Sequence, residues 1–269
     1  MSAIAVGATR PRRRWIWVIV ALAVTAVLVV PVSLRLWLKH SWQHQTSPVA
    51  VYPGPVSHLQ IDAPGDQVTI RPGRQLRVQS SVTWVFGKPS VRRVVHGRTL
   101  QVSAACPRPN LFEDCQVSLA VQVPAGLAIS VRAGSGTIAV SGAAGSLDLA
   151  VTSGAISMTG VSGTVRATAT SGLITGSGLR AARLGAAVTS GQLRLSFSGA
   201  PQFLSLAVGS GSGQAVVPAG ARYAVAANAG PPSLQLAAGL AIVSSRLRLA
   251  AHVGTGVLAV AYPARHRKT

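Results

Sequence analysis

The chain has 269 residues, of which 48% are hydrophobic, 4% are aromatic and 11% are charged. So few charged and aromatic residues argue against an ordinary soluble globular domain with a core of large side chains. The formal net charge of +20 indicates either an anionic partner or arginine as the ordinary surface residue. In the second half of the chain the arginines stand singly, without the interleaved aromatic residues typical of base stacking, so we expect no nucleic-acid partner.

The first predicted element is a membrane segment. Residues 1–14 form a basic tail, and an uncharged run of 20 residues follows from Trp15 to Leu34. This run is long enough to cross a bilayer as a helix, so we predict a transmembrane signal anchor over residues 15–38. A cleaved signal peptide is the alternative. The excess of arginine before the segment predicts a single-pass protein of the cell membrane, with a cytoplasmic N-terminus and an extracellular C-terminal domain.

Two segments of different character follow. Residues 39–55 are predicted to form a polar juxtamembrane linker, in which His40 and His44 lack a third partner for a metal site. Residues 56–123 alternate apolar and polar residues in short bursts between Pro-Gly turns. This pattern predicts an N-terminal β-region that caps or begins the repeats described below.

The only two cysteines, Cys106 and Cys115, lie nine residues apart in a proline-bearing loop. Their spacing excludes a CxxC redox site, and no further ligands accompany them for a metal. The predicted topology places them outside the cell, where disulfides persist. We therefore predict a Cys106–Cys115 disulfide that pins the loop before a strand at residues 116–123.

A Ser-Gly signature recurs in the second half of the chain at steps of 18 to 20 residues, at Ser135, Ser153, Ser171, Ser190 and Ser210. Columns aligned on these serines are apolar at every second position, as in Leu147, Leu149 and Val151, which is strand spacing. One such repeat cannot bury its inner face alone, whereas like-on-like stacking can.

The repeat predicts an all-β fold, a parallel β-solenoid of about 18–20 residues per coil over residues 124–262. Right-handed crossovers are the general rule for such connections. The last residues, 263–269, form a basic tail. The alternative, a low-complexity linker, has no reason to keep apolar columns in register.

The chain resembles a known bacterial family, domain of unknown function 4097, also described as a family of candidate adhesins. The motifs that carry the resemblance are Cys106-Pro107 with Cys115, the turn Val123–Gly126, the sequence Ala133–Gly136 and the later Thr-Ser-Gly repeats. The resemblance covers roughly residues 56–262 and implies a β-solenoid on the cell surface or in the envelope. The family has no assigned catalytic residues. This chain departs from it in having few acidic residues in its repeats.

We expect no catalytic, cofactor or metal site. The solenoid contains one acid, Asp148, and the adjacent Glu113 and Asp114 lie in the cysteine loop, so a carboxylate pair for acid–base chemistry cannot be assembled. The serines of the Ser-Gly signature are expected to be turn residues without a neighbouring base.

The leading functional hypothesis is a membrane-anchored, extracytoplasmic and non-catalytic solenoid that acts as an adhesin-like, scaffold or envelope-interaction module. Its partner would be an anionic cell-wall polymer or another envelope protein. The candidate surface for an anionic partner consists of Arg166, Arg180, Arg183 and Arg194. The alternative is an accessory or sensor protein of an envelope-stress signalling system, and a carbohydrate-active enzyme is least expected.

Overall fold

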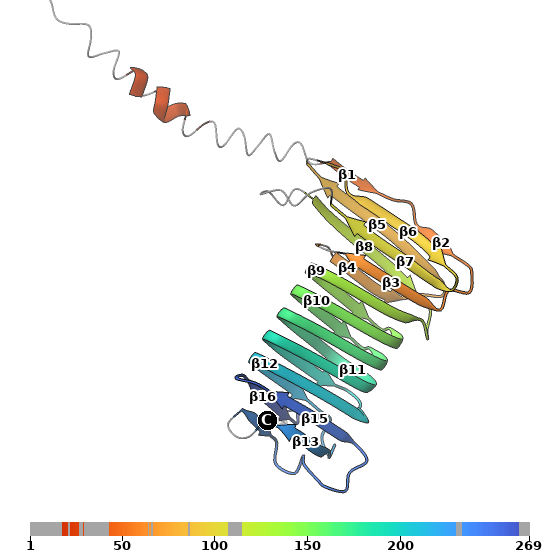
Figure 1. Cartoon of the computed structure of the whole chain (residues 1–269), viewed down its shortest axis with the longest axis vertical. Helices are drawn as coiled ribbons and strands as arrows, with labels where there is room; N and C mark the ends of the chain where they lie inside the picture. Colours follow the sequence, from red (N-terminus) through yellow and green to blue (C-terminus); the bar gives the residue numbers. More distant parts are fainter. Residues whose placement is uncertain are drawn as a thin grey trace, which may run out of the picture. The chain divides into compact units, whose positions relative to one another are not determined.

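The computed structural model describes residues 18–20, 22–26, 29, 43–63, 65, 67–85, 87–106, 115–229 and 233–263. The chain divides into two units, residues 1–43 and 44–269. Within the described residues, the strands form one 16-stranded sheet, and Figure 1 shows how they are stacked along residues 44–269. The predicted all-β fold is confirmed. The predicted basic tail at residues 1–14 lies outside the described residues, and so does all but the first residue of the tail predicted at 263–269.

The predicted transmembrane anchor requires a correction. Most of residues 15–38 lie outside the described residues, and the helical positions that are described fall between residues 18 and 29. Crossing a bilayer needs about 20 consecutive helical residues. Among the described residues, no helix is long and apolar enough to cross a membrane. The single-pass cell-membrane location predicted from the sequence is therefore not supported.

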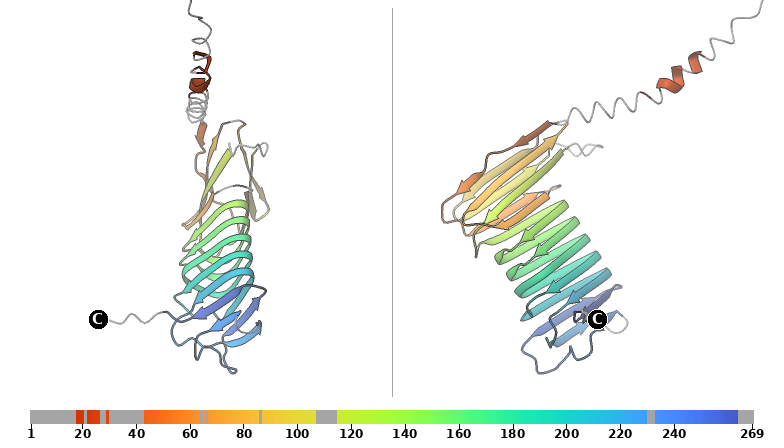
Figure 2. Two further views of the ribbon diagram at one scale, coloured as in Figure 1. Left: turned by 90° about the vertical axis from the view of Figure 1, so that its left-hand side faces the viewer. Right: turned by 180° about the vertical axis from the view of Figure 1, so that it is seen from behind.

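Stacked parallel coils form the centre of the unit at residues 44–269. They consist of β9 (Ala128–Ser141), β10 (Ala144–Thr159), β11 (Ser162–Phe197) and β12 (Phe203–Val216). The register is the one expected from the repeat, since Leu147 pairs with both Ile129 and Val165 at steps of 18 residues. Figure 2 shows these coils from two further sides.

The core of the coils is built from alternate residues of both arms of each repeat. In β10, Leu149 and Val151 before the Ser-Gly corner and Ile156 after it are all buried in one hydrophobic cluster. The chain therefore reverses at each corner, and the two arms present opposite outer surfaces. We call the outward side chains before each corner, such as Asp148, the first face, and those after it, such as Ser157, the second face.

The corners require glycine because a side chain there would overlap the backbone of the neighbouring coil. A Cβ atom on Gly172 would fall on the carbonyl oxygen of Gly154, and one on Gly191 would fall on the carbonyl oxygen of Gly172. Gly211, at a later corner of the same stack, has a φ of 130°, which L side chains rarely adopt. The Ser-Gly period is therefore the period of backbone contact between coils.

The N-terminal end of the stack does not follow chain order. The first coil, β3 (His58–Ala63) and β4 (Gln67–Pro72), pairs with β9 on one side. On its other side it pairs with the later strands β7 (Thr99–Ala105) and β8 (Cys115–Val123).

Antiparallel strands close this end of the stack. Strand β5 (Leu76–Trp84) pairs with β8, and β6 (Ser90–His96) pairs with β7. The short strand β2 (Ala50–Tyr52) pairs with β5, and β1 (Gln43–Thr46) ends the strand order. Such covering strands keep the edge of the parallel stack from being left open.

The C-terminal end shows the same exchange of order. The last strands, β15 (Arg248–Val253) and β16 (Val257–Ala261), pair directly with β12. The earlier strands β13 (Ala224–Asn228) and β14 (Leu234–Leu236) pair with the outer sides of β15 and β16. The last coil therefore lies inside the one that precedes it in the chain.

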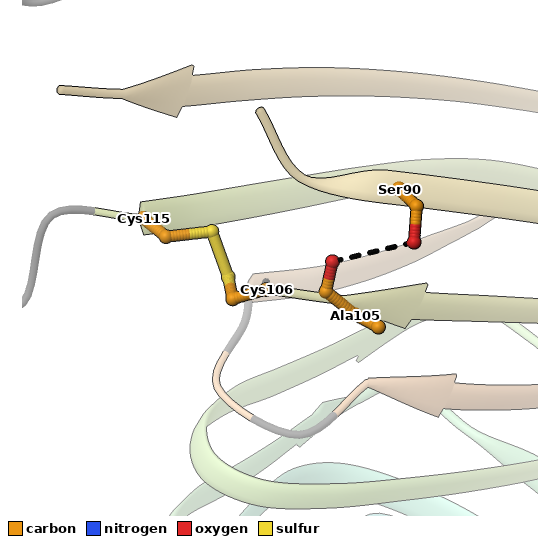
Figure 3. The surroundings of a disulfide bond; sticks show 4 residues. All are labelled: Ser90, Ala105, Cys106 and Cys115. Carbon is orange, nitrogen blue, oxygen red and sulfur yellow. Dashed lines mark hydrogen bonds between the residues drawn. A yellow bond between two sulfur atoms is a disulfide. The ribbon is translucent and has the colours of Figure 1, made fainter. Parts of the chain in front are cut away.

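The predicted disulfide joins the end of β7 to the start of β8 (Figure 3). The Cα atoms of Cys106 and Cys115 are 6.1 Å apart. Beside it, the Ser90 hydroxyl donates to the carbonyl oxygen of Ala105 at 3.5 Å. Residues 107–114, which include Glu113 and Asp114, lie outside the described residues.

Candidate functional site

The four arginines selected from the sequence do not share one face. Arg166 pairs in register with Asp148, and Arg183 pairs with Phe203, which places both arginines on the first face. Arg194 pairs with Gln214 on the second face. The backbone amide of Arg180 donates to the carbonyl oxygen of Val161 at 2.9 Å. Arg180 lies at the turn that connects one coil to the next, and so belongs to neither face.

The first face combines charges of both signs. Asp148 stands beside Arg166 on the neighbouring strand, and Asp62 stands beside Arg132 in the same way. Opposite charges on adjacent strands attract each other and lower the local potential. The described part of the first face is therefore a mixed surface.

On the second face, a hollow of about 230 Å³ has Arg194 as its cation. Its polar lining consists of hydroxyl and amide side chains from four successive coils, namely Ser157, Thr175, Ser177, Ser196 and Gln214. No acidic side chain lines it. The arrangement offers hydroxyl, amide and guanidinium groups to one ligand, which suits a hydroxyl-rich partner that carries negative charge.

Hydrogen bonds between coils hold part of this lining in place. The Thr175 hydroxyl donates to the carbonyl oxygen of Ile156 at 3.3 Å. The Ser177 hydroxyl donates to the Thr159 hydroxyl oxygen, also at 3.3 Å. Because these hydroxyls donate within the protein, their oxygens can act as acceptors for a ligand, and the exposed Arg194 supplies donors.

A second hollow on the same face was not foreseen from the sequence. It lies nearer the N-terminal end, has a volume of about 390 Å³ and includes Arg71, Arg77, Gln79 and Gln122. Its lining also contains no acidic residue. The sequence contains a pattern that could have predicted it. Arg71 and Arg77 stand next to the apolar Ile70 and Val78 in alternating strands, so both arginines are expected to point outward.

Asp148 lies in a hollow on the first face. The hollow that includes Asp148 also includes His58 and Ser146, without a second carboxylate. Among the described residues, no three His, Cys, Asp or Glu side chains lie close enough to hold a metal. His44 instead contacts hydroxyl oxygens, the nearest being that of Thr83 at 3.0 Å, and His40 lies outside the described residues.

Comparison with known proteins finds one family model that matches part of the chain. Residues 114–228 match the family model Toastrack DUF4097, so the resemblance to family 4097 is confirmed over that segment. No curated protein sequence matches the chain.

Several solved structures are similar to this chain. One is a candidate cell adhesion protein from Clostridium sporogenes, with 11% identity and a TM-score of 0.38 over 82% of this chain and 100% of that one. Another is a candidate adhesin from Bacteroides fragilis, with 10% identity and a TM-score of 0.38 over 82% of this chain and 97% of that one. A third is a candidate lipid-binding protein from Parabacteroides distasonis, with 10% identity and a TM-score of 0.24 over 83% of this chain and 97% of that one.

Proposed function

This chain carries a Toastrack DUF4097 domain over residues 114–228, and on that premise we propose that it is a non-catalytic, adhesin-like or scaffold module. Its binding surface is the second face of the coils. Its partner is an extended, hydroxyl-rich polymer with acidic groups, such as an anionic polymer of the bacterial cell wall.

The observation that carries the proposal is the hollow around Arg194. Four coils contribute to it, from Ser157 in β10 to Gln214 in β12. Neighbouring strands lie about 4.8 Å apart, so the polar row spans roughly 14 Å across the strands. A polymer lying along this row would meet a similar set of donors and acceptors at each coil, and many individually weak contacts would add up.

The charge distribution favours the second face over the first. Both hollows on the second face contain arginine and no acid, whereas Asp148 stands beside Arg166 on the first face. An anionic polymer would therefore be attracted to the second face, and salt would weaken that attraction because exposed charges are screened.

The non-catalytic part of the proposal depends on the environment of Asp148. General acid–base chemistry on a glycan needs two carboxylates or an equivalent pair. The charged residue that pairs with Asp148 on the neighbouring strand is Arg166, and it is not a second acid. The Asp148 side chain is exposed.

The test compares Arg194→Gln with Arg183→Gln, which removes the same charge from the first face. Retention of the full chain on purified bacterial cell wall is measured over a range of salt concentrations. We expect the wild type to be released as salt rises. We expect Arg194→Gln to bind about tenfold more weakly, the loss of one charge-assisted contact, and Arg183→Gln to bind like the wild type. Equal retention of all three proteins would overturn the proposal.

A further inference from the structure

The N-terminal strands form a further polar pocket of about 280 Å³, which includes Ser47, Ser80, Lys88 and Arg93. We propose that this pocket binds a small oxyanion, a carboxylate or a phosphate group, between the guanidinium of Arg93 and the ammonium of Lys88. The inference is independent of the proposed function, because the pocket shares no residue with either hollow of the second face.

Arg93 occupies a position that faces the core. In an antiparallel pair, directly opposite residues point to the same side of the sheet. Arg93 on β6 is opposite Val102 on β7, and Val102 is fully buried. The neighbouring Arg92 is opposite the partly exposed Ser103 and points outward. An arginine thus stands where the coils elsewhere place leucine or valine.

The residue that meets Arg93 also faces the core. Ser80 on β5 is opposite the buried Leu119 and is only 4% exposed. The Nη2 atom of Arg93 donates to the hydroxyl oxygens of Ser80 and Ser47, each at 2.8 Å. Both serines are held in turn, since the Ser80 amide donates to the Ser47 hydroxyl at 3.1 Å and the Ser47 amide donates to the Ser80 carbonyl at 2.8 Å.

Among the described residues, these contacts leave the positive charge of Arg93 without a counter-charge. Its partners are neutral hydroxyls, its Nε atom is buried without a hydrogen-bond partner, and no acidic side chain lines the pocket. Removing a cation from water is costly unless an anion pairs with it. An oxyanion in the pocket would supply that charge.

Lys88 adds a second cation to the same pocket. Its Nζ atom lies 5.8 Å from the centre of the Trp84 ring, a cation–π arrangement that holds the side chain over the ring. The remaining wall includes the apolar Val82, Pro89 and Val91. The pocket therefore fits a small anionic group attached to a short apolar stem.

The experiment uses the full chain labelled with ¹⁵N, titrated separately with inorganic phosphate and with acetate. The backbone amide signals of Val82 and Val91, which line the pocket and are unchanged in all variants, report on binding. We expect a saturable shift, weakened at least tenfold in Arg93→Gln and several-fold in Lys88→Gln. The matched control Arg92→Gln, which removes the neighbouring outward charge, should bind like the wild type. The two titrations decide between a carboxylate and a phosphate as the preferred group.

Three results would overturn the inference. The first is the absence of a saturable shift with either anion, and the second is an equal weakening in Arg93→Gln and Arg92→Gln. The third concerns Glu113 and Asp114, which lie outside the described residues. If the double variant Glu113→Gln/Asp114→Asn binds phosphate and the wild type does not, an acid of the chain already neutralises the pocket. Because Lys88 is exposed, Lys88→Gln keeps the test decisive even if Arg93→Gln fails to fold.

Discussion

Leu249 pairs with Leu204 in the parallel ladder between β12 and β15, although Val225 comes between them in the chain and pairs with the outer side of Leu249. The opposite end shows the same relationship, where Leu59 lies between Ile129 and Leu100. The first and last of the stacked coils along the chain are thus inner coils. Each is covered by strands that lie closer to the middle of the sequence.

This order predicts that a residue close to the C-terminus behaves as a core residue. Leu249 is 1% exposed between two coils, so Leu249→Ala should lower the free energy of unfolding by about 2–5 kcal/mol. Leu236→Ala is the matched control in the outer strand β14, where the side chain is only half-buried, and it should cost about 1 kcal/mol. Urea denaturation measures both, and equal costs would contradict the inner position of the last coil.

The corner glycines predict a sharp contrast between two Gly→Ala changes. A Cβ on Gly172 would overlap the Gly154 carbonyl oxygen, whereas a Cβ on Gly185 meets no atom within 4 Å. Gly172→Ala should therefore destabilise the chain by at least about 2 kcal/mol. Gly185→Ala should be neutral or stabilising by about 0.5 kcal/mol, because glycine weakens a strand interior. Thermal unfolding of the two variants measures both effects. Similar unfolding midpoints would contradict the close contact between coils at the corner.

The disulfide predicts a redox-dependent stability of the N-terminal strands. Reduction of Cys106–Cys115 frees the connection between β7 and β8 and should cost about 2–3 kcal/mol through the entropy of the short loop. Thermal unfolding with and without a reducing agent measures the loss. The variant Cys106→Ser/Cys115→Ser should match the reduced wild type and should not respond to the reductant. If the reductant also lowered the stability of that variant, the loss in the wild type could not be assigned to the Cys106–Cys115 disulfide.

Tyr223 predicts a loss of stability at high pH. Burial, and secondly the charge of Tyr262, raise the pKa of the Tyr223 hydroxyl from 10.0 to about 12. A group whose pKa is higher in the folded state contributes stability that is complete below pH 10, where both states are protonated. That contribution falls as the pH rises from 10 towards 12, because the unfolded chain releases its proton first.

Two variants separate this effect from other titrations. Tyr223→Phe should remove the extra decline between pH 10 and 12 without lowering stability at pH 8, because the buried hydroxyl has no hydrogen-bond partner. Tyr262→Phe should lose about 1 kcal/mol at pH 8, since its hydroxyl donates to the Ala221 carbonyl oxygen at 2.8 Å. Urea midpoints at pH 8, 10 and 11 test both expectations, and an unchanged pH profile in Tyr223→Phe would refute the assignment.

The surface chemistry could be predicted only in part. The sequence predicted that the arginines of the repeats lie outward, and Arg166, Arg183 and Arg194 are exposed. It did not separate them by face, because the faces are defined by the corner at which each coil reverses. The contrast between Arg92 and Arg93 also depends on pairing. The sequence does not distinguish two adjacent arginines. The register between β6 and β7 decides that Arg93 is the one that faces the core.

The sequence by itself determined the repeating structural unit of this protein, the coil. Side-chain alternation defines the strands, the Ser-Gly period defines the coil, and the aliphatic columns predict a core that only stacking can bury. The tertiary structure alone decided the order of the end coils. The apolar residues of β15 and of β13 alternate with the same period, so either strand satisfies the pattern beside β12. The choice depends on long-range packing, including the contact of the buried Tyr223 amide with the Leu240 carbonyl oxygen, and no local pattern encodes it.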